Sequence, residues 1–191
     1  MGKKTWMVVD LEATCDERRF PFQEMETIEI GAVLVDPDTL EPVGEFQTFV
    51  QPVVHRELTP FCTTLTSITQ ADVDAAPRFP EALQRWAAWI PGPVRFASWG
   101  NYDRNQLLID GQRHGVTLPF GVEHHFNIKA GFASATGTRR CGMAKALERV
   151  GLPLVGTHHR GIDDARNIAR LLAWALTGPR AKRGREEGSG Q

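Results

Sequence analysis

Two acidic side chains end an apolar run near the N-terminus. The chain reads VVDLEAT over residues 8–14, and the β-branched and apolar entry at residues 6–9 predicts a β-strand. Successive side chains of a strand point to opposite faces, so Asp10 and Glu12, two positions apart, point the same way. Carboxylate oxygens are the ligands that hard cations such as Mg²⁺ and Mn²⁺ prefer. The sequence therefore predicts a strand whose end offers two metal ligands on one face.

The composition is that of one soluble domain. With 191 residues, the chain can bury a sizeable core without disulfides or a structural metal. Its 22 basic and 23 acidic residues neither indicate nor exclude a nucleic-acid partner, because an acidic metal cluster offsets local basic contacts. Three cysteines without Cys-x-x-Cys spacing argue against a disulfide framework or structural zinc. We expect a cytoplasmic protein without signal peptide or membrane span, because the first apolar run meets Asp10 too early for either.

The order of the predicted elements is typical of an α/β fold. The first strand and strand candidates at 27–35 and 44–50 predict a meander of three consecutive strands. Helices and a strand then alternate, with a strand at 94–98 and helices at 80–90, 102–114, 142–150 and 161–176. Basic residues among glycines predict a disordered basic tail at 178–191, after one domain at 1–177.

A third acid, Asp103, follows the predicted strand at 94–98 and begins the helix at 102–114. In open α/β sheets, ligands collect at strand ends and the adjoining helix N-termini, so Asp103 can face the same crevice as Asp10 and Glu12. An Asp at the start of a helix is also a common capping residue. The position alone leaves both interpretations open.

The segment HHRGIDD at 158–164 offers two histidines and two acids with the same spacing. Asp163 lies on a mixed stripe of the following helix, whereas Asp164 shares a stripe with Ile168, Leu171 and Leu172. An acid on an apolar stripe is costly unless it is paired or bound to a metal. We therefore predict that Asp164 is a ligand, that Asp163 is an exposed cap, and that His159 belongs with Asp164.

Together these residues resemble the DEDDh pattern of the DnaQ-like 3′–5′ exonucleases in the RNase H-like superfamily. The pattern consists of four acids, Asp10, Glu12, Asp103 and Asp164, and of His159 five residues before the last acid. The sister class has a tyrosine four residues before that acid, where this chain has Arg160, so the histidine class is favoured. Further segments between residues 6 and 176 resemble the branch of the histone-mRNA 3′-exonuclease and the enhanced-RNAi nucleases. These segments are Asp10-Leu11-Glu12-Ala13-Thr14-Cys15, Phe61-Cys62, Leu65-Thr66-Ser67-Ile68-Thr69-Gln70, Ser98-Trp99-Gly100, Asn127-Ile128-Lys129 and His159-Arg160-Gly161-Ile162-Asp163-Asp164.

The resemblance implies an RNase H-like three-layer fold, in which helices flank a mixed five-stranded sheet whose first three strands form an antiparallel meander. It also implies release of nucleoside 5′-monophosphates from 3′ ends of single-stranded RNA or DNA, with RNA favoured. By the same resemblance, two divalent ions, Mg²⁺ or Mn²⁺, would relieve the repulsion among the acids. Asp10 would bridge both ions, Glu12 and Asp164 would complete one site, and Asp103 would help to hold the second. His159 would act as the general base, since imidazole takes up a proton near neutral pH.

Substrate contacts are expected at Ala13, Thr14, Leu65, Thr66 and Arg160. For Leu65, packing beneath a loop is an equal alternative. Two other functions remain open: a non-catalytic RNA-binding or scaffold module that has kept the fold, and a proofreading-type DNA exonuclease with the same chemistry. A pure binder gains nothing from converging carboxylates that repel phosphate, so the exonuclease is our leading hypothesis.

Overall fold

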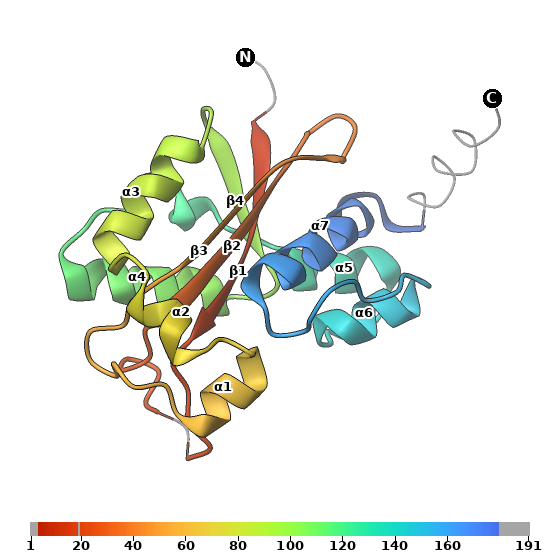
Figure 1. Cartoon of the computed structure of the whole chain (residues 1–191). Helices are drawn as coiled ribbons and strands as arrows, with labels where there is room; N and C mark the ends of the chain where they lie inside the picture. The colour runs from red at the N-terminus through yellow and green to blue at the C-terminus, as the bar shows by residue number, and fades with distance from the viewer. Residues whose placement is uncertain (1–3, 19, 180–191) are drawn as a thin grey trace.

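Five strands form one mixed sheet with helices on both faces (Figure 1). The computed structural model describes residues 4–18 and 20–179. The sheet order is β3-β2-β1-β4-β5, with bounds β1 (Thr5–Ala13), β2 (Thr27–Val35), β3 (Pro42–Phe49), β4 (Val94–Ser98) and β5 (Phe126–Asn127). β1, β2 and β3 form an antiparallel meander, whereas β4 and β5 continue the sheet in parallel with β1. The predicted α/β class, mixed five-stranded sheet and antiparallel meander are confirmed.

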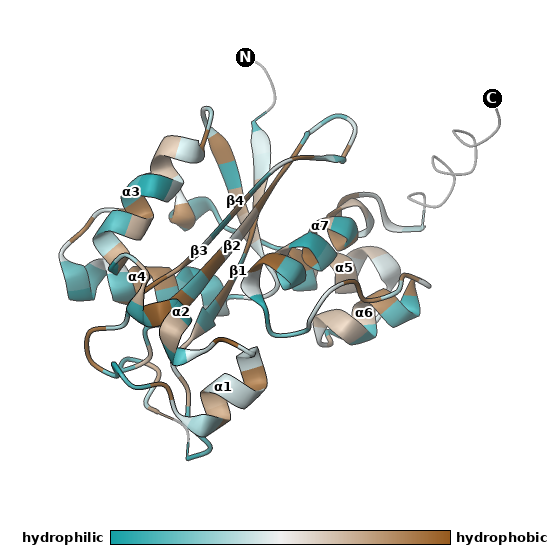
Figure 2. Ribbon diagram, in the orientation of Figure 1, coloured by the Kyte–Doolittle hydropathy of each residue, from teal (hydrophilic) through white to brown (hydrophobic). Residues whose placement is uncertain are grey.

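The helices divide between the two faces of the sheet. α3 (Phe79–Trp89) and α4 (Tyr102–His114) cover one face, and α5 (Ile128–Thr136), α6 (Met143–Arg149) and α7 (Gly161–Thr177) cover the other (Figure 1). Because side chains alternate along β1, Met7 and Val9 join the first core, whereas Trp6 and Val8 join the second. All nine residues of β2 are buried, as expected for a strand covered on both sides. Figure 2 accordingly shows hydrophobic residues along the strands and mixed colours on α3 and α7.

The sequence pattern did not locate three short α-helices or the position of the fifth strand. α1 (Pro60–Thr66) and α2 (Gln70–Asp74) lie near the end where β1 finishes (Figure 1) and are too short to show a helical period. Their signals are local: Thr59 caps α1, and Thr69 forms a capping box with Asp72 in α2. α5 begins in the same way, at the Asn127 cap. β5 has only two residues and depends on pairing with β4.

Helix α7 touches β2 at a crossing of two glycines. A Cβ on Gly31 would lie 2.1 Å from the carbonyl carbon of Gly161, a separation that no side chain can occupy. Gly31 is paired with Asp10 in the neighbouring strand β1. The glycine contact therefore brings the first turn of α7, with Asp164, against the acidic end of β1.

The predicted basic tail falls almost entirely on residues 180–191, which lie outside the described residues, so it stays a prediction. α7 ends at Thr177, one residue beyond the predicted helix end. Among the helices within residues 4–18 and 20–179, none combines the length and the apolar character needed to cross a membrane.

Candidate active site

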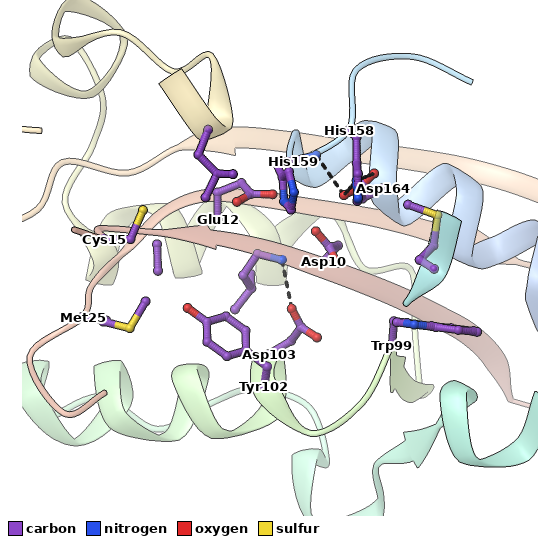
Figure 3. A pocket seen from close by; sticks show the side chains of 14 residues that line it. Asp10, Glu12, Cys15, Met25, Trp99, Tyr102, Asp103, His158, His159 and Asp164 are labelled. Carbon is purple, nitrogen blue, oxygen red and sulfur yellow. Dashed lines mark hydrogen bonds and ion pairs between the residues drawn. The ribbon is translucent and has the colours of Figure 1, made fainter. Parts of the chain in front are cut away.

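Four acids from three elements meet at the end of β1. Asp10 and Glu12 come from β1, Asp103 from the first turn of α4 and Asp164 from the first turn of α7. Asp10, Glu12 and Asp164 each offer a carboxylate oxygen within 4.8 Å of the others. All four line a cavity of about 310 Å³, with Asp10 at the centre of the group in Figure 3. The sequence thus predicted residues that the fold does bring together.

The strand β1 presents its acids because it extends beyond its neighbour β4. The last β1–β4 pair joins Val9 to Ser98, so residues 10–13 of β1 have no β4 partner. Asp10 and Glu12 share the face of Trp6 and Val8, which is the face covered by α7. The open end of β1 therefore directs both carboxylates into the cavity below α7.

Asp103 is held against β1 through the backbone. Its Oδ1 accepts a hydrogen bond of 3.1 Å from the N–H of Leu11, at the level where β4 has ended. The N-cap of α4 is Asn101, and Asp103 lies two residues further with only 3% of its surface exposed. Of the two interpretations of Asp103, the structure therefore supports the crevice-facing acid and not the cap.

Both histidines of the doubled pair lie at Asp164. The carboxylate of Asp164 accepts a side-chain hydrogen bond from His158 Nδ1 at 2.9 Å and a backbone one from His159 N–H at 3.1 Å. The two imidazole rings stack with centroids 4.0 Å apart, and both line the cavity (Figure 3). His159 has a φ of 63°, a left-handed conformation that is uncommon outside glycine. The side-chain partner of Asp164 in this structure is thus His158, whereas His159 faces the cavity beside it.

The prediction that Asp163 is an exposed cap of α7 is wrong. Arg160 occupies the N-cap position of α7 without a side-chain cap bond. Asp163 instead accepts a 2.9 Å hydrogen bond from Thr157 N–H and pairs with Arg166. It ties the preceding loop to the helix because the loop folds back over the first turn of α7. Asp164 points inward as predicted and is 5% exposed.

Burial raises the pKa of all four site acids, and repulsion by neighbouring acids adds to it at Asp10 and Glu12. For Asp10, burial is the largest cause, and the charges of Asp103, Glu12 and Asp164 raise the pKa further. The pKa of Glu12 rises to about 9, first by burial and then through Asp164 and Glu29. Burial raises the pKa of Asp103 to about 6, although a backbone hydrogen bond opposes the change. Clustered carboxylates of this kind fit a divalent cation, which supplies the opposing charge and takes oxygen ligands.

The pKa of His159 is lowered. Partial burial is the main cause, the neighbouring His158 adds to it, and Asp164 opposes it. A lowered pKa leaves the His159 imidazole neutral near pH 7. A neutral ring can accept a proton, which a general base must do.

The predicted substrate contacts divide into two groups. Ala13 and Leu65 line the cavity, and Leu65 is 37% exposed there. Thr14 and Thr66 are buried and bond to the backbone: Thr14 Oγ1 accepts from Glu26 N–H, and Thr66 Oγ1 donates to the Cys62 carbonyl. Thr14 thus holds the loop after β1, Thr66 bonds within α1, and neither side chain lines the cavity.

Arg160 points away from the cavity in this structure. Its Nε donates to Glu29 Oε2 at 3.1 Å, and its guanidinium lies 5.2 Å from the centre of the Phe49 ring. Glu29 is fully buried and also accepts from the N–H of Gly161 at 3.0 Å. Arg160 thereby neutralises a buried charge beneath the start of α7.

Several cavity residues were missed by the sequence analysis. Trp99 and Tyr102 line the cavity and precede Asp103 within the segment 98–103, so the motif itself carried their signal. Cys15 also lines it and ends the segment 10–15, in which it was given no role, whereas Met25 and Met143 belong to no segment with a catalytic meaning. Their proximity arises only when the loop after β1 and the start of α6 close around the strand end.

The family model described as Exonuclease (RNase_T) matches residues 7–172. The chain belongs to the exonuclease family. This match includes the four acids and both histidines, so the predicted family is confirmed.

Relatives place this family member in the predicted branch. ERI1 exoribonuclease 3 of Mus musculus is 34% identical over 178 residues, which cover 87% of the chain and 52% of that protein. The 3′-5′ exoribonuclease 1 of Homo sapiens is 32% identical over 183 residues, covering 88% of the chain and 51% of that protein. The solved nuclease domain of 3′hExo, a DEDDh family member bound to rAMP, aligns with a TM-score of 0.84 at 30% identity, covering 91% and 92% of the two chains. The chain spans about half the length of the curated relatives it matches.

Proposed function

We propose that this chain is a metal-dependent 3′–5′ exonuclease acting on single-stranded nucleic acid, with RNA favoured over DNA. The observation that carries the proposal is the convergence of Asp10, Glu12, Asp103 and Asp164 with His159 on one cavity. Relatives named as exoribonucleases and the family member bound to rAMP support this chemistry and a nucleoside 5′-monophosphate product.

Asp10, Glu12 and Asp164 would hold one divalent cation, and Asp10 with Asp103 would hold a second. Bound Mg²⁺ or Mn²⁺ supplies an activated water and charge stabilisation for the leaving oxygen. His159 would take the proton of the attacking water on a ring nitrogen, because its ring is neutral near pH 7 and lies in the cavity wall. The hydrogen bond from Leu11 N–H would keep the Asp103 carboxylate oriented toward the cavity.

The cavity suits one terminal nucleotide. Its volume of about 310 Å³ is at the lower end of the range for small-molecule sites, so a duplex end would not enter intact. Leu65, Trp99 and Tyr102 give the wall an apolar and aromatic surface on which a splayed base can stack. A single-stranded 3′ end is therefore the expected substrate, and the preference for RNA rests on the relatives.

The test is incubation of the purified protein with 5′-labelled RNA and DNA of equal sequence, with Mg²⁺, Mn²⁺ or EDTA, resolved at single-nucleotide steps. We expect a ladder that shortens from the 3′ end, proceeds faster on RNA and disappears in EDTA. Asp10→Asn should abolish cleavage, whereas Glu57→Gln, an exposed acid outside the cavity, should not change it. Full activity of Asp10→Asn, or cleavage that survives EDTA, would contradict the proposal.

A further inference from the structure

The carboxylate of Asp164 is held by the residue that the family pattern leaves without a role. His158 Nδ1 lies 2.9 Å from Asp164 Oδ2 and 3.2 Å from Oδ1. Oδ2 also accepts the backbone N–H of His159 at 3.1 Å. Two donors therefore converge on Oδ2, so Oδ1 is the oxygen with more capacity left for another partner.

The loop before α7 fixes His158 in this place. Asn167, fully buried on α7, accepts from Val155 N–H at 3.1 Å and donates to the Val155 carbonyl at 2.7 Å. Two residues further along the loop, Thr157 N–H donates to Asp163. These bonds tie the loop to α7 on both sides of Gly156, whose φ of 79° permits the turn. These backbone hydrogen bonds thus hold the loop so that the imidazole of His158 lies against Asp164.

His158 also contacts the proposed base. Its ring stacks on His159 at 4.0 Å with an interplanar angle of 15°. His159 has the left-handed backbone conformation, which needs support from its surroundings to persist. One side chain therefore touches both a proposed metal ligand and the proposed base.

We propose that His158 is a positioning residue of the metal site: its Nδ1–H holds the Asp164 carboxylate in the orientation in which it would bind a cation, and its ring supports His159. The inference rests on the proposed function, because it assigns a role within the same site. Hydrogen-bond partners of metal-ligating side chains typically change metal affinity or activity by about 10- to 100-fold when they are removed. An effect of that size is expected in metal affinity, since His158 holds the carboxylate of a proposed metal ligand.

The test measures metal binding directly, by calorimetric titration of Mn²⁺ without substrate, for the wild type and four variants. We expect His158→Ala to weaken Mn²⁺ binding by about 10- to 100-fold. His158→Asn should recover part of this loss, because its amide N–H lies near the position of Nδ1. His124→Ala, whose side chain is 86% exposed, is the matched control and should bind like the wild type. Asp10→Asn should lose binding and marks the metal site.

The outcomes separate the two proposals. If Asp10→Asn loses Mn²⁺ binding but His158→Ala binds like the wild type, the role of His158 is overturned while the metal site stands. If His158→Asn, which keeps a donor, binds no better than His158→Ala, positioning through the hydrogen bond is also overturned. If the wild type binds no Mn²⁺, the metal site itself fails, and the role of His158 fails with it. In rate measurements at rising Mg²⁺, His158→Ala should need more metal than the wild type for half-maximal rate. An unchanged metal requirement would contradict the positioning role.

Discussion

Replacing Glu12 by glutamine should stabilise the metal-free protein while it removes a proposed metal ligand. Glu12 is 8% exposed, and its pKa is raised from 4.5 to about 9, first by burial and then by the charges of Asp164 and Glu29. The folded state therefore binds this proton more tightly than the unfolded state. The stability associated with the protonated form is fully present below pH 4.5 and is lost as the pH rises towards 9. A neutral amide of similar size has no such dependence.

The size of the effect follows from the same interval. Between pH 4.5 and pH 7 the unfolded state releases the Glu12 proton while the folded state keeps it, which lowers the free energy of unfolding by about 3 kcal/mol at about 1.4 kcal/mol per pH unit. For a chain of this length, this corresponds to a rise in Tm of about 6–12 °C for Glu12→Gln at pH 7. At pH 5 the difference should fall below about 1 kcal/mol. Asp10, Asp103 and Asp164, whose pKa values are raised as well, should steepen the loss of wild-type stability with pH.

The assay is thermal unfolding followed by circular dichroism in EDTA from pH 5 to pH 8, with Glu57→Gln as an exposed control. Adding Mg²⁺ should raise the Tm of the wild type more than that of Glu12→Gln, because a ligand stabilises the state that binds it. A wild-type Tm that does not fall from pH 5 to pH 8 in EDTA would refute the reasoning. So would a Glu12→Gln variant that is less stable than the wild type at pH 7.

Two further predictions separate chemistry from structure. His159→Ala should lower kcat by roughly 10²-fold or more at every metal concentration. Unlike His158→Ala, it should not weaken Mn²⁺ binding. Single-turnover rates at saturating Mg²⁺ will check the loss of rate. Arg160→Ala should lower the free energy of unfolding by about 3 kcal/mol, because Glu29 would remain buried without its cationic partner, whereas KM for an oligonucleotide should not rise. Urea denaturation will measure that loss, and Arg160→Ala combined with Glu29→Gln should recover part of it; a raised KM with unchanged stability would restore Arg160 to the substrate-contact group.

Most of the fold could be predicted from the segments of the sequence that show a strand or helix period. Alternation along β1 places Asp10 and Glu12 on one face, and the helical period of α7 turns Asp164 inward; both follow from the geometry of a single element. The meander, β4 and α4 were recognisable from similar patterns and turn residues. α1 and α2 were not, because five to seven residues give no period and their capping signals were overlooked.

The doubled histidine marks the limit of what the sequence determines. His158 and His159 precede α7, where no regular period fixes the direction of a side chain, and the spacing to the two acids is equal. Which ring meets Asp164 depends on the loop bonds to Asn167 and on the left-handed backbone of His159.

Tertiary contacts also decided the partners of single side chains. Arg160 and Glu29 are 131 positions apart in the chain, and the N–H of Leu11 becomes available to Asp103 only because β4 ends earlier than β1. The sequence by itself determined the faces on which Asp10, Glu12 and Asp164 lie, because strand and helix periods act within one element, but it left Asp103 open between ligand and cap. The structure decided which atoms meet, because such contacts depend on where strands end and how loops close between elements.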